Sequence, residues 1–197
     1  MPNGIGYGTA SGFPAAVGGP DSASPRLCKW SNCPTCATSG VPPIRATMRL
    51  CLYQPEIAGN VGAVMRLGAC MGVPIDLIEP MGFEWDDKRV RRTAMDYIDH
   101  VEVVRHASFE AFLETTGGSR LVLFTTKAMG SSYRFDYQPA DILLFGQESA
   151  GVPMEVAMHC VAKVRIPIRA EVRSFNLATS AALALGEALR QTDGLPK

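Results

Sequence analysis

The sequence predicts an α/β protein whose mostly parallel sheet carries helices on both faces. Short apolar segments typical of strands alternate with segments whose apolar residues recur at helical spacing, as in parallel sheets covered by helices. Hydrophobic residues make up 47% of the 197 residues and charged residues 19%, which is enough to build a sizeable core. No apolar run approaches the roughly 18 residues of a membrane span. We therefore expect a cytoplasmic protein without membrane contact.

The first 47 residues differ in composition from the rest of the chain. They contain seven Gly and seven Pro and show no periodic apolar pattern. Such a segment cannot bury enough surface to offset the entropy lost on ordering, so we expect a disordered extension at residues 1–47. A clean strand pattern begins at Met48, and Met1 and Met48 have about equal claims as the start of translation. Residues 48–197 are expected to form one domain.

Apolar runs bounded by turn residues predict the strands of this domain. In order along the chain, they lie at residues 48–54, 74–80, 100–106, 119–126, 141–148 and 162–168.

Helices are predicted between these strands and after the last of them. The first has Val61, Val64, Met65 and Gly68 on one side, which predicts a buried face. The expected helices lie at residues 60–72, 86–95, 108–116, 153–161 and 176–192. Ser108 is a suitable N-cap for the third helix, and Pro153 suits the first turn of the fourth. The last helix is long and rich in Ala and Leu.

Cysteine and histidine residues do not form a recognisable metal or catalytic motif. Cys28, Cys33 and Cys36 have a spacing that zinc sites use, but no fourth ligand lies nearby in sequence, so we expect no metal. The three histidines are expected to be solvated or structural. The remaining cysteines lie in apolar stretches and are expected to be packed thiols: Cys51, Cys70 and Cys160.

Three loops interrupt the hydrophobic pattern where strands end, which is where ligands bind in open α/β sheets. The first loop leads into a helix carrying Asn60 and Arg66. Asn60 is about as well explained as a helix cap, whereas an arginine on a mostly apolar helix indicates a partner. The second loop places Glu148, a potential partner of Arg66, between two glycines. In the third loop Ser174 or Asn176 is expected to cap the closing helix.

A cluster of basic residues follows Asp86 and Asp87 on the expected helix at residues 86–95. Two explanations fit it equally well: a solvated helix with local ion pairs, or a phosphate-binding face. The cluster comprises Lys88, Arg89, Arg91 and Arg92.

Taken together, the three loops resemble the motifs of the SPOUT superfamily, and within it the TrmH-type RNA 2′-O-methyltransferases. The matching patterns are Asn60-x-Gly62-x3-Arg66, then Phe145-Gly146-x-Glu148-x2-Gly151-x-Pro153, then Ser174-x-Asn176-Leu177 with Ser180. The stretch from Glu79 to Arg92 is the most specific, and it resembles the tRNA (cytidine/uridine-34-2′-O)-methyltransferases. The resemblance runs from Met48 to about residue 192.

The resemblance implies a SPOUT fold with a deep trefoil knot in its C-terminal part, S-adenosylmethionine bound in the knot, and a homodimer with the active site at its interface. It implies methylation of the ribose 2′-hydroxyl of the wobble pyrimidine in the tRNA anticodon stem-loop. The alternatives are another tRNA or rRNA site, or an RNA-binding protein of this fold without catalysis.

The residues that the resemblance assigns to the site fall into three groups. Cofactor contacts are Phe124, Gly146, Ile166 and Ser174, with Glu148, Gly151, Pro167 and Leu177 as neighbours. The catalytic group is Arg66, Asn60, Ser174 and Asn176, and the RNA contacts are Lys88, Arg89, Arg91 and Arg92. The chain departs from close relatives in the second loop, with Gln147 in place of Pro and Ser149-Ala150 in place of Thr-Arg.

Overall fold

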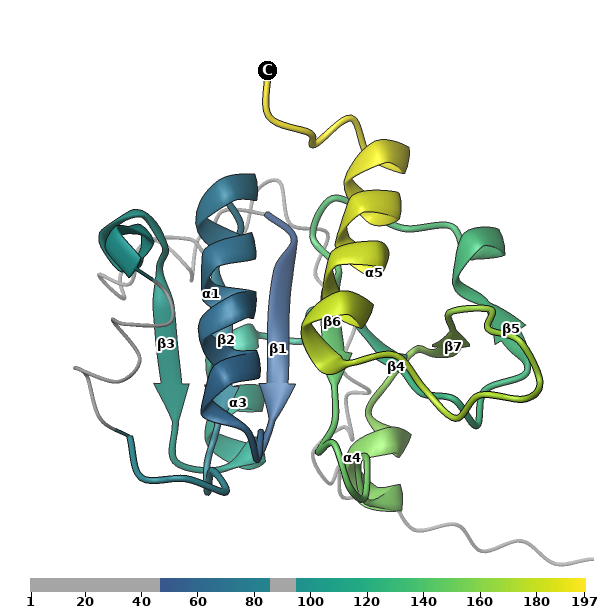
Figure 1. The fold of residues 1–197 in the computed structure, drawn as a ribbon, viewed down its shortest axis with the longest axis horizontal. Coiled ribbons are helices and arrows are strands. Elements are labelled where there is room, and N and C mark those ends of the chain that lie inside the picture. The colour runs from purple at the N-terminus through teal and green to yellow at the C-terminus, as the bar shows by residue number, and fades with distance from the viewer. Residues whose placement is uncertain (1–46, 86–94) are drawn as a thin grey trace, which may run out of the picture. The chain divides into compact units, whose positions relative to one another are not determined.

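The computed structural model describes residues 47–85 and 95–197. These residues form a seven-stranded sheet in the order β3-β2-β1-β6-β4-β7-β5, in which every neighbouring pair is parallel (Figure 1). The strands are β1 (Arg49–Tyr53), β2 (Ile75–Ile78), β3 (Val103–His106), β4 (Leu121–Phe124), β5 (Gly130–Ser131), β6 (Ile142–Phe145) and β7 (Ala162–Arg165). The predicted parallel α/β sheet is confirmed.

Two helices cover each face of the sheet, as predicted. In Figure 1, α1 (Ala58–Met71) and α5 (Leu177–Gln191) lie in front of the sheet, and their apolar residues share one buried cluster with inward side chains of the strands. On the other face, α3 (Phe109–Thr116) and α4 (Met154–Met158) contribute to a second cluster. Two 3-10 helices complete the described part, η2 (Met95–His100) and η3 (Ser132–Arg134).

The local signals explain most element boundaries. The predicted inner face of α1 is buried at all four positions, and Ser108 caps α3 by accepting a hydrogen bond from the Ala111 amide. The two residues of β5 were not predicted, because so short a strand has no measurable periodicity. The expectation for Cys70 was wrong: it lies on the outer side of α1 and is exposed, whereas Cys51 is buried.

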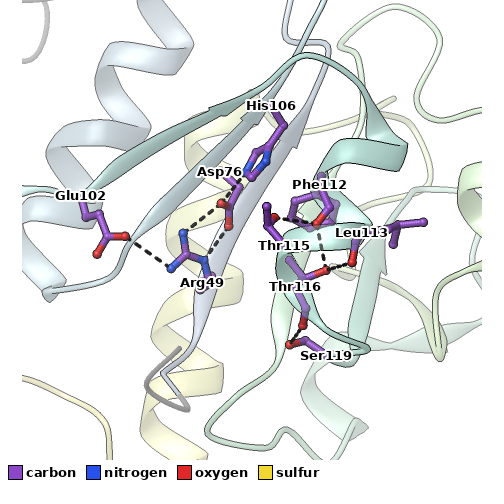
Figure 2. A network of polar contacts seen from close by, with 9 residues as sticks. All are labelled: Arg49, Asp76, Glu102, His106, Phe112, Leu113, Thr115, Thr116 and Ser119. Carbon is purple, nitrogen blue, oxygen red and sulfur yellow. Dashed lines mark hydrogen bonds and ion pairs between the residues drawn. The ribbon is translucent and has the colours of Figure 1, made fainter. Parts of the chain in front are cut away.

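Two buried titratable side chains, Asp76 and His106, and the partly buried Arg49 lie together on the first three strands (Figure 2). Asp76 on β2 accepts hydrogen bonds from Nε and Nη2 of Arg49 at 2.7 and 2.9 Å, and its Oδ1 lies 2.8 Å from Nε2 of His106. Burial alone would lower the pKa of Arg49, but its hydrogen bonds and charge attraction to Asp76 outweigh this and raise it. The carboxylate thus joins β1, β2 and β3 from within the core.

Replacing Asp76 by Asn should destabilise the protein by about 3 kcal/mol, because Arg49 would remain largely buried without its counter-charge. Urea unfolding monitored by circular dichroism measures this loss. Glu102→Gln is the matched control: the Glu102 side chain is 66% exposed and 3.9 Å from Arg49, so the change should stay below about 1 kcal/mol. Equal losses in both variants would contradict a structural role for the buried carboxylate.

Candidate active site

The candidate site lies where four neighbouring parallel strands end. The segments that follow β1, β4, β6 and β7 meet at one edge of the sheet, because parallel strands direct their carboxyl ends the same way. Side chains and backbone of these segments, together with the start of α5, enclose a cavity of about 940 Å³. A cavity of this size is in the range of small-molecule and cofactor sites.

Most of the site residues expected from the sequence line this cavity. They are Asn60, Phe124, Gly146, Glu148, Gly151, Ile166, Ser174, Asn176 and Leu177. Two expected residues do not line it: Pro167, which is exposed in the segment after β7, and Arg66.

A chain of hydrogen bonds connects the three loops across the cavity. Glu148 accepts from the Glu56 amide at 2.9 Å and from Nδ2 of Asn60 at 3.0 Å. Asn60 accepts in turn from Nδ2 of Asn176 at 2.8 Å, and Oδ1 of Asn176 accepts from the Ala178 amide at 2.9 Å. Residues 56, 60, 148 and 176 are therefore held as one unit, through direct bonds between residues up to 116 positions apart.

The two asparagines differ in their relation to the helices. The cap interpretation of Asn60 is wrong: α1 already begins at Ala58, its N-cap position is Ile57, and the buried Asn60 side chain points to the other loops. The cap interpretation of Asn176 is confirmed, since it is the N-cap of α5. Asn176 thus combines a capping bond through its oxygen with a bond to Asn60 through its nitrogen.

A second contact reinforces the link between the first and second loops. Glu56 accepts from the Ser149 amide at 2.8 Å and from the Ser149 hydroxyl at 2.7 Å. These bonds, the hydroxyl first, hold the pKa of the Glu56 carboxyl below its ordinary value of 4.5. The two loops therefore bind each other reciprocally. The Glu148 side chain accepts from the Glu56 backbone, and the Glu56 side chain accepts from the Ser149 backbone. The sequence offered no signal for this pairing of residues 93 positions apart.

The second loop folds back tightly on itself between its two glycines. Gln147 and Gly151 exchange two backbone hydrogen bonds of 2.9 Å, and Gly151 adopts a φ of 76°, in the left-handed region that favours glycine. A Cβ on Gly146 would lie 2.4 Å from the carbonyl carbon of Gly151. Glycine at position 146 is thus required by the close approach of the backbone.

The glutamine that replaces proline in the second loop makes a contact of its own. Nε2 of Gln147 donates to Oε1 of Gln54 at 3.0 Å. Gln54 directly follows β1 and has a φ of 47°, which non-glycine residues seldom adopt without support. The pair adds a further bond between the first and second loops.

Arg66 lies outside the cavity, on the exposed side of α1. Its guanidinium stands 4.8 Å from the ring centroid of Tyr97 in η2. Arg66 lies six positions after Asn60, which corresponds to about 9 Å along the helix axis. Lys88, Arg89, Arg91 and Arg92 lie outside the described residues, as does the extension at 1–46 with Cys28, Cys33 and Cys36.

Comparison with known proteins agrees with this arrangement. The model of the SpoU rRNA Methylase family matches residues 47–186. The chain belongs to the SpoU rRNA methylase family. This confirms the resemblance that the three loop motifs indicated.

Individual proteins are also similar to this chain in sequence and in structure. A tRNA (cytidine(34)-2′-O)-methyltransferase of Beijerinckia indica is 51% identical over 152 residues, covering 75% of this chain and 94% of the relative. A solved structure described as "Structural insights into the 2-OH methylation of C/U34 on tRNA" is 41% identical, with a TM-score of 0.70. The match covers 74% of this chain and 95% of that chain. The structure of an AdoMet-bound rRNA methyltransferase of Sinorhizobium meliloti is 25% identical, with a TM-score of 0.69. The match covers 76% of this chain and 58% of that chain.

We also searched the described part of this SpoU-family chain for metal sites, for membrane-spanning helices and for further charged residues in the cavity. Its His, Cys, Asp and Glu side chains nowhere gather in a group of three that could hold a metal ion. Its helices include none that is long and apolar enough to cross a membrane. The charged side chains lining the cavity besides Glu148 are Lys127, Lys163 and Arg173. Lys163 was not singled out from the sequence, because an exposed lysine on a strand is ordinary.

Gly146→Ala should lower the free energy of unfolding of this SpoU-family protein by about 1–3 kcal/mol, because backbone must move to admit the methyl group. Gly59→Ala is the matched control: the same group there meets no atom within 4 Å, so stability should stay or rise by up to about 1 kcal/mol. Denaturant unfolding measures both. A Gly146→Ala variant as stable as the control would show that the loop is not tightly closed.

The Glu56–Ser149 contact should make stability depend on pH. A carboxyl whose pKa is lowered by folding stabilises the protein fully above its unfolded value of 4.5, and this contribution is lost as the pH falls through the folded pKa. We expect Ser149→Ala to be less stable than the unmodified protein at pH 6, with the difference shrinking towards pH 3. Urea unfolding at several pH values tests this, and a pH-independent difference would argue against the contact.

Proposed function

We propose that this chain transfers a methyl group from S-adenosylmethionine to the ribose 2′-hydroxyl of the wobble pyrimidine, nucleotide 34, in the anticodon loop of tRNA. The observation that carries the proposal is the meeting of three motif loops at one cavity in a chain 51% identical to a tRNA (cytidine(34)-2′-O)-methyltransferase. The proposal places residues 48–197 in one methyltransferase domain that acts in the cytoplasm.

The chemistry of the cavity fits the cofactor. Phe124, Ile166 and Leu177 offer apolar surface for a purine, and the turn between Gly146 and Gly151 brings backbone groups close to a ligand. Glu148, Pro167 and Ser174 complete the cofactor contacts that we propose. When bound, S-adenosylmethionine supplies a methyl group already activated by its sulfonium. A relative of the same fold is AdoMet-bound, which supports this assignment.

The task of the protein's own residues is to position the ribose and help its hydroxyl lose a proton. Asn60 and Asn176 are held by the hydrogen-bond chain at the cavity wall, and the exposed Ser174 lines the same cavity, which supports the proposal that these three residues bind the ribose. We assign Arg66 an orienting role, through its planar fork of donors, towards the hydroxyl or an adjacent phosphate. It is a poor base, since an arginine pKa lies above about 12.

The position of Arg66 supports a homodimer with the active site at its interface. Arg66 is exposed and does not line the cavity of its own chain, so we propose that the Arg66 that faces the bound ribose comes from the second copy. The exposed Leu183 on α5 and Phe175 beside it provide apolar surface for such a contact.

A trefoil knot in the C-terminal part is also proposed. β6 inserts between β1 and β4, β7 lies on the other side of β4, and the segment from Ile166 to Asn176 returns to the loop after β6. This strand order is compatible with a chain threaded through its own loop, and the resemblance to the SPOUT methyltransferases supports the proposal. Lys88, Arg89, Arg91 and Arg92 are proposed to contact tRNA phosphates.

The test is to incubate the protein with tritiated S-adenosylmethionine and bulk tRNA from a strain lacking the matching enzyme, and then to map the labelled nucleotide. We expect a 2′-O-methylated pyrimidine at position 34. Arg66→Ala should reduce turnover by about 100-fold or more while cofactor affinity, measured by calorimetry, stays unchanged.

Arg190→Ala is the matched control for this test, because Arg190 is exposed at the far end of α5 and paired with Glu187. Label at another tRNA nucleotide, or in rRNA only, would support the proposed methyl transfer but show that nucleotide 34 of tRNA is not its target. Cofactor binding without any label would favour the non-catalytic alternative. Loss of cofactor binding in Arg66→Ala would make Arg66 a structural residue.

A further inference from the structure

A second hollow lies at the end of the sheet formed by β5 and β7. Its volume is about 480 Å³, and β5, η3 and β7 provide its walls. Figure 1 shows β5 and β7 at one end of the sheet, away from β3 and from β2, which carries the buried Asp76. We call it the edge hollow; its charged lining residues are Arg134, Lys163 and Arg165.

The lining of the edge hollow has only one sign of charge. All three charged side chains are cations, and no carboxylate lines it among the residues that the structure describes. Lys163 and Arg165 are exposed and alternate along β7 with Val164, which is buried in the core, so the two cations lie on the same face of the strand. The strand geometry therefore concentrates positive charge on one surface.

These three cations also differ from the arginines that serve the fold. Five arginines elsewhere in the described chain lie within 4.0 Å of a carboxylate: Arg49, Arg105, Arg120, Arg169 and Arg190. Of the other two described arginines, Arg66 lies over the Tyr97 ring and Arg173 lines the candidate active site. None of the ion pairs among the described residues involves Arg134, Lys163 or Arg165. Clustered cations without internal counter-charges repel one another, and an anionic partner relieves this repulsion.

The edge hollow and the candidate active site share a lining residue. Lys163 lines both the edge hollow and the cavity at the strand ends, and Lys127 and Arg173 line that cavity as well. A strip of positive charge thus runs from the cavity to the end of the sheet. Beside it, Tyr133 is 47% exposed and Met129 is 93% exposed, which offers an aromatic face and an apolar surface to unstacked bases.

We propose that the edge hollow binds the phosphodiester backbone of the RNA substrate next to the nucleotide whose ribose enters the cavity. RNA backbone is a repeating anion, and lysine and arginine side chains provide most of its contacts. The inference rests on the proposed function, and it concerns residues other than Lys88, Arg89, Arg91 and Arg92. Here Arg134 and Arg165 act as substrate-positioning residues, outside the chemistry itself.

The test compares tRNA binding by the full chain with that of the double variant R134Q/R165Q, which leaves Lys163 and the cavity intact. At about 0.1 M salt we expect the Kd for tRNA to rise about tenfold, and the slope of log Kd against log salt to fall by about 1.5, since each lost phosphate contact removes 0.7–0.9. The Kd for S-adenosylmethionine should not change.

The matched control is R190Q/K197Q, which removes the same charge at exposed positions outside both hollows. It should leave the salt slope unchanged. If R134Q/R165Q bound tRNA with the Kd and slope of this control while the unmodified chain methylated tRNA, the edge hollow would not be an RNA surface. An equal loss of cofactor affinity in R134Q/R165Q would also overturn the proposal. A chain that neither bound nor methylated tRNA would instead contradict the proposed function.

Discussion

The carboxylate of Glu148 is the contact on which the candidate site depends. It accepts one hydrogen bond from the loop after β1 and another from Asn60 at the start of α1, and Asn60 extends the connection to Asn176 and the cap of α5. A single bond of this kind contributes only about 1 kcal/mol net to stability. In a connected network, however, the loss of one member leaves its neighbours without partners. Three loops far apart in the sequence therefore keep one relative position, and the cavity owes its shape to it.

The two ends of the sheet use charge in opposite ways. Around β1, β2 and β3, Asp76 forms an ion pair with Arg49 and a hydrogen bond with His106, and both contacts contribute to the fold. Around β5 and β7, cations without internal partners face outwards along the cavity and the edge hollow. The chain carries no formal net charge, so attraction of an RNA substrate depends on this local separation. The same separation explains why overall composition indicates no nucleic-acid partner.

The second loop combines a position that has room only for glycine with neighbours that bind the segment after β1. The close approach of Gly146 to Gly151 leaves no room for a side chain at position 146. Gln147 binds Gln54, and Ser149 binds Glu56, so both residues stabilise the loop against the segment after β1. Glu148 lies between them and accepts a hydrogen bond from Asn60.

Local signals in the sequence, namely apolar periodicity, helix caps and glycines, predicted most of the described strands and helices, a mostly parallel α/β sheet, and the three loops as the place of the site. Ser108 and Asn176 were identifiable as caps for that reason. Only the tertiary structure decided the partners. Asn60, read as an even choice between cap and site residue, points across the cavity because Glu148 and Asn176 lie there. Three further features depend on which segments pack together. They are the exposure of Cys70, the two-residue β5, and the edge hollow that Lys163 and Arg134 both line. Contacts between residues tens of positions apart leave no periodic trace in a single sequence.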